Sequence, residues 1–254
     1  MAEDDQRVTL VYPRRYHRGD RVIFSCDTPG WYELCMEDSL KTALVYVQKV
    51  AVFHIPFGTM PRVGYPPRAF KGLQHLMTAE KAEQGKAALR RNLALNPLDQ
   101  HGETGMWPHA SASVETRGEA LFAARNAIDG IYANHRHYPY PYQSWGVNKD
   151  PKAELMVDFG VKVVLDEIVL TLRADYPHDS YWTQAAVEFD DGGREILELK
   201  KQSAPQHFQV AAHTTRRIIL KELIKAKDDS PYPALTQIEA WGNITGAREK
   251  DGQF

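Results

Sequence analysis

Short runs of β-branched and aromatic residues, bounded by turn-forming residues, recur along the chain and predict an antiparallel β protein. Residues 163–172 are apolar on both faces, which predicts a central strand between two layers. Asp190-Asp191-Gly192-Gly193 separates two other runs and predicts a hairpin. Many short strands with little helix favour an antiparallel sandwich. The expected strands cover residues 7–12, 21–26, 31–36, 43–54, 154–159, 163–172, 185–189, 194–199, 216–224 and 236–241.

The strand pattern is interrupted after residue 55. Residues 56–67 are rich in Gly and Pro and predict a loop, whereas residues 78–91 have helical composition with Thr78 in the place of an N-cap. This segment is expected to connect two β modules. We therefore expect a small β-rich module at 1–60, a loop and helix connector at 61–90, a β-sandwich at 91–243 and a tail at 244–254.

The overall charge argues against a nucleic acid partner. The chain has 254 residues, of which 31 are basic and 33 acidic, so that its net charge is −2. It carries no basic stripe of the kind that binds a polyanion. No apolar run approaches the ~20 residues of a membrane helix, and the acidic N-terminus lacks the apolar stretch of a signal peptide. We expect no transmembrane segment, and a cytoplasmic location is favoured.

The two cysteines, Cys26 and Cys35, flank a predicted turn at Asp27-Thr28-Pro29-Gly30. A disulfide between them is compatible with this spacing. Two free thiols in a reducing compartment are equally compatible, and we favour that interpretation.

The second part of the chain contains a series of short motifs in a fixed order. They are Arg91-Asn92-Leu93-Ala94, Asn126-Ala127-Ile128-Asp129-Gly130, Ser144-Trp145, Leu155-Met156-Val157-Asp158-Phe159-Gly160, Val187-Glu188-Phe189-Asp190-Asp191-Gly192, Arg217-Ile218-Ile219-Leu220 and Gln237-Ile238-Glu239-Ala240-Trp241-Gly242. In this order, residues 91–243 resemble the discoidin family, also called coagulation factor V/VIII type C domains. The nearest branch is the family-32 carbohydrate-binding modules. The resemblance implies an all-β, galactose-binding-like antiparallel sandwich (a jelly roll), whereas residues 1–90 resemble no family.

The resemblance also implies a structural calcium ion near Asp129. The oxygen ligands would come from Asn126 (carbonyl), Asp129, Asn134, Glu239 and Ala240 (carbonyl). An Asp-Gly turn can aim carboxylate and carbonyl oxygens at one point, as a hard cation requires. The family usually has Asp or Asn directly after the Gly, where this chain has Ile131. The alternative is that Asp129 only caps a turn by accepting backbone N–H groups.

Two segments rich in aromatic residues, 135–145 and 173–182, are expected to form the ligand site. The sugar-binding branch grips hydroxyls with an Arg at the end of a strand, a polar residue about five positions later and a His from the earlier loop. An aromatic ring stacks on the sugar. The corresponding ligand-binding residues here are His135, His137, Tyr140, Arg173, Asp175, His178, Tyr181 and Trp182. The alternative is that Tyr138, Tyr140 and Tyr142 only pack over the sandwich, and Trp145 is expected in its core.

These features predict a non-catalytic carbohydrate-binding protein with weak affinity. The sequence carries no nucleophile elbow, HExxH, phosphate-binding Gly loop or metal-binding cysteine cluster. Two alternatives stay open. One is an enzyme that cleaves or modifies a carbohydrate, and the other is a protein-interaction or assembly module. In the latter, the N-terminal strands would supply a homodimer interface by edge pairing.

Overall fold

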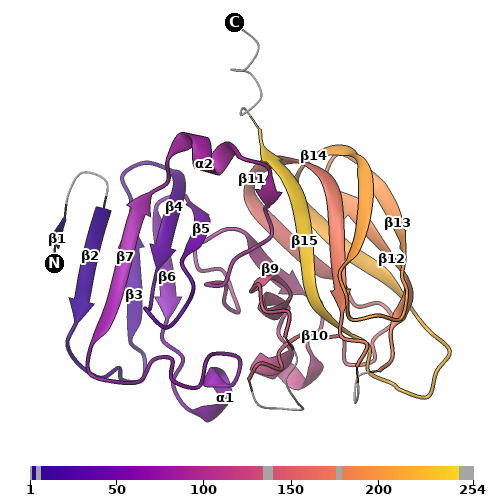
Figure 1. Ribbon diagram of the computed structural model, residues 1–254, viewed down its shortest axis with the longest axis horizontal. Helices are drawn as coiled ribbons and strands as arrows, with labels where there is room; N and C mark the ends of the chain where they lie inside the picture. Colours follow the sequence, from indigo (N-terminus) through magenta and orange to yellow (C-terminus); the bar gives the residue numbers. More distant parts are fainter. Residues whose placement is uncertain (1, 4–6, 134–139, 176–178, 246–254) are drawn as a thin grey trace, which may run out of the picture.

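A computed structural model describes residues 2–3, 7–133, 140–175 and 179–245, and antiparallel β-sheets dominate it (Figure 1). The strands and turns expected from the sequence correspond to two sheet systems that lie side by side, one built from the N-terminal residues and one from the C-terminal residues. Among the described residues, none of the helices combines the length and apolar character that crossing a membrane requires.

The N-terminal module, residues 2–3 and 7–81 of the described chain, contains a five-stranded sheet and a strand pair. The sheet has the order β1 (Ala2–Glu3), β2 (Arg7–Tyr12), β7 (His75–Lys81), β4 (Gly30–Cys35), β5 (Ala43–Val47), and the pair joins β3 (Arg21–Ser25) to β6 (Val50–His54). Leu34, Val45 and Phe53 are fully buried in its core. Cys26 and Cys35 are free thiols, as favoured from their spacing.

The helix expected at 78–91 is wrong. Residues 75–81 form β7, which lies between β2 and β4, and Met77 and Ala79 pair with residues of those strands. Only α2 (Gln84–Ala88) is helical. Sheet pairing on both sides overrides the helical composition of this segment, because strand formation depends on neighbouring strands more than on local propensity. The N-terminal sheet therefore extends beyond residue 60.

The C-terminal sandwich contains eight strands in the described residues. They are β8 (Arg91–Asn92), β9 (His109–Ala112), β10 (Trp145–Gly146), β11 (Leu155–Leu172), β12 (Trp182–Phe189), β13 (Arg194–Glu198), β14 (Gln206–Lys225) and β15 (Ala234–Ile244). The expected runs at 154–159 and 163–172 are one long strand, β11. Its register with β14 shifts between Asp158 and Val163, where Gly160 adopts a φ of 73°. A bulge at Gly160 thus bends the strand without ending it.

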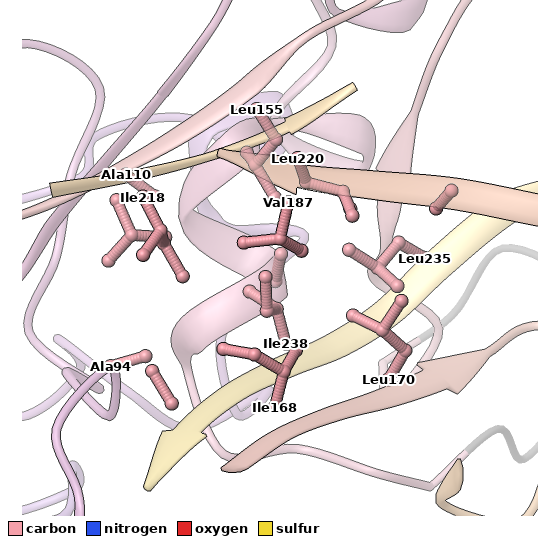
Figure 2. Close-up of a cluster of buried hydrophobic side chains, with 14 of the residues drawn as sticks. Ala94, Ala110, Leu155, Ile168, Leu170, Val187, Ile218, Leu220, Leu235 and Ile238 are labelled. Atoms are coloured by element: carbon pink, nitrogen blue, oxygen red, sulfur yellow. The ribbon is translucent and has the colours of Figure 1, made fainter. Parts of the chain in front are cut away.

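The bend lets β11 serve both layers of the sandwich. Residues 155–158 pair with β9 and with the second half of β14, whereas residues 163–172 pair with β15. Figure 2 shows the core between the layers, in which Leu155, Val187 and Leu220 face the opposite group of Ile168, Leu170, Leu235 and Ile238. The buried apolar side chains of two sheets face each other, as expected for an antiparallel sandwich.

The segment between β8 and β9 joins the module to the sandwich. The backbone of Trp107 exchanges two hydrogen bonds with Tyr46, at 2.9 and 3.0 Å. The side chain of Gln100 bonds both the N–H and the carbonyl of His54, at 2.8 Å each. The chain also has short helical elements, α1 (Thr59–Arg62) in the module and η1 (Thr116–Gly118), η2 (Ala120–Phe122) and η3 (Ala124–Ile128) in the sandwich. The hydrogen bonds of Trp107 and Gln100 fix the module and the sandwich against each other.

Candidate ligand site

The two aromatic segments lie side by side at one end of the sandwich. The Nη1 of Arg173, at the end of β11, donates to the carbonyl of Tyr142 at 2.6 Å. The same guanidinium lies over the Tyr142 ring, 3.9 Å from its centroid. The predicted proximity of the two loops therefore exists in the structure, and Arg173 is the residue that joins them.

Arg173 is nevertheless buried, with 1% of its surface exposed. Its Nε donates to the carboxylate of Asp175 at 2.9 Å, and Asp175 itself is half-buried. A guanidinium enclosed by Tyr142 and Asp175 holds the loops in place. It offers little surface to a sugar, in contrast to the contact role that the resemblance implied.

The two tryptophans of these loops belong to the core. Trp145 is fully buried, as expected, and its Nε1 donates to the carbonyl of Val114 at 3.0 Å. Trp182 is 2% exposed and packs against Trp145 with ring centroids 6.4 Å apart. Trp182 therefore has no open face for the stacking role considered for it. Tyr181 is half-buried and packs on the same core.

Four of the residues expected in the site lie outside the described residues. They are Asn134, His135, His137 and His178. Tyr140 is described and half-buried. Of the expected ligand-binding residues, Tyr140, Asp175 and Tyr181 thus keep part of their surface exposed, whereas Arg173 and Trp182 do not.

Asp129 is a buried carboxylate with a full set of donors. Its Oδ1 accepts from the Ile131 N–H and from Gln237 Nε2, both at 2.8 Å. Its Oδ2 accepts from Gln143 Nε2 at 3.2 Å. Burial raises the pKa of Asp129 to about 6, against the lowering effects of Arg125 and of these donors. The motif therefore does form a turn capped by Asp129, the simpler of the two expected roles.

Gln237 is the residue that the sequence reasoning missed. Its Oε1 accepts from the Gly130 N–H at 2.9 Å, and its Nε2 donates to the carbonyl of Asn126 at 2.7 Å. This side chain reaches from β15 into the centre of the Asp129 turn. The sequence offered only one signal for this role, a polar residue inside the expected strand 236–241.

The other expected metal ligands are already engaged by protein donors. Glu239 accepts from the Tyr132 hydroxyl and from Trp241 Nε1, at 2.8 Å each. The Ala240 carbonyl accepts from the Leu93 N–H at 2.7 Å. The Asn126 side chain donates to the carbonyls of Ala120 and Ser144, and its Oδ1 is a buried atom with no partner among the described residues. The Glu239 carboxylate and the Ala240 carbonyl thus each accept hydrogen bonds from protein donors in this structure.

A cleft of about 520 Å³ lies between the N-terminal module and the sandwich, next to the Asp129 turn. We call it the inter-module cleft. The module contributes Ser39, Leu40, Lys41, Gly64, Tyr65 and Pro66, and the other side contributes Pro97, Arg125, Asp129, Gly130, Ile131, Tyr132, Ala133, Tyr140 and Pro141.

Contacts across the inter-module cleft fix its two sides. The ammonium group of Lys41 donates to the carbonyl of Gly130 at 3.3 Å. The guanidinium of Arg125 lies 4.3 Å from the centroid of the Tyr65 ring. A second depression of about 490 Å³ beside α1 shares Tyr65 and Tyr140 with the cleft. Six of the fifteen residues that line the cleft come from a module that resembles no family, so the motifs could not reveal this wall.

Several solved sugar-binding modules are similar to part of the chain, at low sequence identity. No family model and no curated protein matches the chain. Chitosan-binding module 1 of the chitosanase/glucanase from Paenibacillus sp. IK-5 is similar, with 19% identity, a TM-score of 0.41, and coverage of 60% of this chain and 99% of the module. The family 32 carbohydrate-binding module of C. perfringens NanJ, solved with galactose, has 15% identity, a TM-score of 0.40, and coverage of 52% and 91%. The lectin domain of lectinolysin, solved with the Lewis B antigen, has 18% identity, a TM-score of 0.44, and coverage of 61% and 98%.

These structures include the class that the order of the motifs resembles. The similarity concerns the β-sandwich. At such identities and TM-scores it carries no argument about the ligand of this chain, which must come from the site itself.

Proposed function

We propose that this chain is a non-catalytic carbohydrate-binding protein whose ligand lies in the inter-module cleft, at the loop end of the sandwich. The observation that carries the proposal is the lining of the cleft, where two partly exposed tyrosine rings accompany buried polar groups. Tyr132 is 44% exposed and Tyr140 is half-buried. The volume of about 520 Å³ lies in the usual range for small-molecule sites.

The chemistry of these groups suits a sugar. The C–H face of a pyranose is apolar enough to lie against a tyrosine ring, while its hydroxyls both donate and accept hydrogen bonds. Lys41 and Arg125 bring N–H donors to the cleft wall. Asp175 and Tyr181, also at the loop end of the sandwich, remain predicted contacts for a longer ligand. We expect affinities in the micromolar to millimolar range, or about −4 to −8 kcal/mol.

The carboxylates argue for binding without catalysis. Glycoside hydrolysis generally needs two carboxyl groups on either side of the scissile bond. Among the described residues that line the inter-module cleft, Asp129 is the one carboxylate, and hydrogen bonds engage both of its oxygens. It is therefore held as a structural group.

Titration calorimetry with galactose-, glucose- and rhamnose-type sugars tests the proposal. Tyr140→Ala should weaken the binding of a sugar ligand about tenfold or more, which corresponds to about 1.4 kcal/mol. Tyr232→Ala is the matched control, because Tyr232 is 42% exposed and does not line the cleft. If Tyr140→Ala binds as the wild type does, the ligand does not lie in the cleft. Turnover of an aryl glycoside by the wild type would favour the enzyme alternative.

Exposed apolar residues of the N-terminal sheet support a second candidate role, self-association. Val11 and Leu76 are cross-strand partners on β2 and β7 and are 54% and 40% exposed. In the described part of the sheet, β1 is the outer edge strand, and such edges can pair with a second copy. A dimer mass in light scattering that Val11→Lys reduces to the monomer mass would support a homodimer. A monomer mass for the wild type at high concentration would exclude it.

A further inference from the structure

One nitrogen atom lies among four oxygen atoms, two of which, the Asn126 carbonyl and an Asp129 carboxylate oxygen, were expected to bind a cation. The Nε2 of Gln237 is 2.6 Å from the Thr236 carbonyl, 2.7 Å from the Asn126 carbonyl, 2.8 Å from Asp129 Oδ1 and 3.4 Å from the Ile131 carbonyl. An amide NH₂ carries two hydrogens and a partial positive charge, whereas every surrounding atom is a negatively polarised oxygen. Gln237 therefore supplies the electropositive centre of this cluster.

The orientation of the amide follows from its other end. The Oε1 of Gln237 accepts from the Gly130 N–H at 2.9 Å. If the amide were turned by 180°, Oε1 would face the other oxygens and the NH₂ would face the Gly130 donor, and both contacts would be repulsive. The nitrogen must therefore point into the cluster.

The residues present do not fit a calcium ion here. Calcium takes ~6–8 oxygen ligands at about 2.3–2.6 Å, and it would have to lie where the Gln237 nitrogen lies. Two of the expected ligands, the Glu239 carboxylate and the Ala240 carbonyl, are engaged by other donors. The side-chain amide of Gln237 contacts the oxygens of the Asp129 turn in place of a cation.

We infer that the Gln237 side chain takes the place of the structural cation and makes the Asp129 turn independent of calcium. Through this one amide, the last strand, β15, holds the carbonyls of Asn126 and Ile131 and the carboxylate of Asp129. Asp129 and Ile131 also line the inter-module cleft, so the amide braces one wall of it. The inference concerns the brace and stands whether or not the cleft binds a sugar.

Thermal unfolding in the presence of a chelator or of calcium tests this inference. We expect the melting temperature of the wild type in EDTA and in millimolar CaCl₂ to agree within about 1 °C. After dialysis, elemental analysis should find no bound calcium. Gln237→Glu replaces the amide by a second carboxylate facing Asp129. It should melt about 5–10 °C below the wild type in EDTA, because two like charges are then buried together. Calcium should restore much of this loss in melting temperature. The new carboxylate oxygen and the four oxygens that now surround Gln237 Nε2 would together offer five ligands to the ion.

Glu239→Gln is the matched control. It should show no calcium response, because Glu239 bonds Tyr132 and Trp241 and does not face the Asp129 turn. A wild type that loses several degrees in EDTA and recovers them with calcium would overturn the inference. If Gln237→Glu does not fold, the wild-type measurement and its calcium content decide the matter alone.

Discussion

The buried guanidinium of Arg173 provides the sharpest test of how the loop end is built. Arg173→Met keeps an apolar stem of similar shape and removes the charge and the donors of the guanidinium. It deletes the hydrogen bond to the Tyr142 carbonyl and the contact with the Tyr142 ring, both buried. It also deletes the ion pair with Asp175, whose side chain is 35% exposed.

These losses can be weighed one by one. A hydrogen bond from a charged donor is worth about 1.5–3 kcal/mol. A desolvated cation–π contact adds about 1–2 kcal/mol. The ion pair with Asp175 contributes about 0–1 kcal/mol because water screens it. The burial of the apolar Met side chain offsets about 1 kcal/mol. We expect Arg173→Met to lower the free energy of unfolding by about 2–4 kcal/mol.

Urea unfolding followed by circular dichroism measures this change. Asp175→Asn is the control, because it removes only the partly exposed carboxylate of the ion pair and keeps the bond from Arg173 to the Tyr142 carbonyl; it should cost less than about 1 kcal/mol. Arg173→Met within about 0.5 kcal/mol of the wild type would refute the assignment of Arg173 as a positioning residue. Wild-type stability combined with a complete loss of sugar binding would instead restore the direct contact expected from the sequence.

Three further substitutions test the packing around the site. Burial raises the pKa of Asp129 from 3.8 to about 6, so its contribution to stability is present in full below pH 3.8 and is lost as the pH rises through 6. In urea unfolding, the difference in free energy of unfolding between the wild type and Asp129→Asn should therefore fall by about 3 kcal/mol between pH 4 and 7. Gly160→Ala should cost more than about 2 kcal/mol, because a Cβ there would lie 2.6 Å from the Trp107 ring, whereas Gly192→Ala, also at positive φ but in open space, should cost about 1 kcal/mol. Trp145→Ala should cost about 3–5 kcal/mol by calorimetry through the cavity it leaves. Equal costs for the two glycines, or a flat pH difference for Asp129, would contradict these contacts.

The strands of the sandwich could be predicted because their signals are local. Residues 163–172 are apolar on both faces, and the structure places them between two neighbouring strands in β11. Turn chemistry was equally informative at Asp190-Asp191-Gly192-Gly193, which separates β12 from β13. Prediction of strand ends from sequence failed at Gly160, because a glycine can end a strand or stand at a bulge within it. The expected strand ended at Phe159, and the Trp107 ring, 2.6 Å from where a Cβ of residue 160 would lie, explains why a glycine stands at the bulge.

The errors arose where distant neighbours decide the outcome. Residues 78–91 have the composition of a helix, but strands on both sides recruit the first of them, residues 78–81, into the N-terminal sheet. Aromatic residues in a loop carry the same signal whether they face water or the core. Tyr142 and Trp182 therefore could not be distinguished from Tyr140 by sequence. In the structure, Tyr142 and Trp182 are buried, whereas Tyr140 is only half-buried.

The same reasoning explains why the motifs describe the scaffold better than the site. A motif such as Asn126-Ala127-Ile128-Asp129-Gly130 defines a turn, and its donors come from Gln237 more than 100 residues later, because a sheet brings β15 beside it. The opposite wall of the cleft comes from Lys41 and Tyr65, in a module whose sequence resembles no family. The shape and polarity of the cleft depend on both parts, since neither encloses it alone. Ligand choice, in the function proposed here, is therefore set where the N-terminal module docks, and the sandwich supplies a rigid support for it.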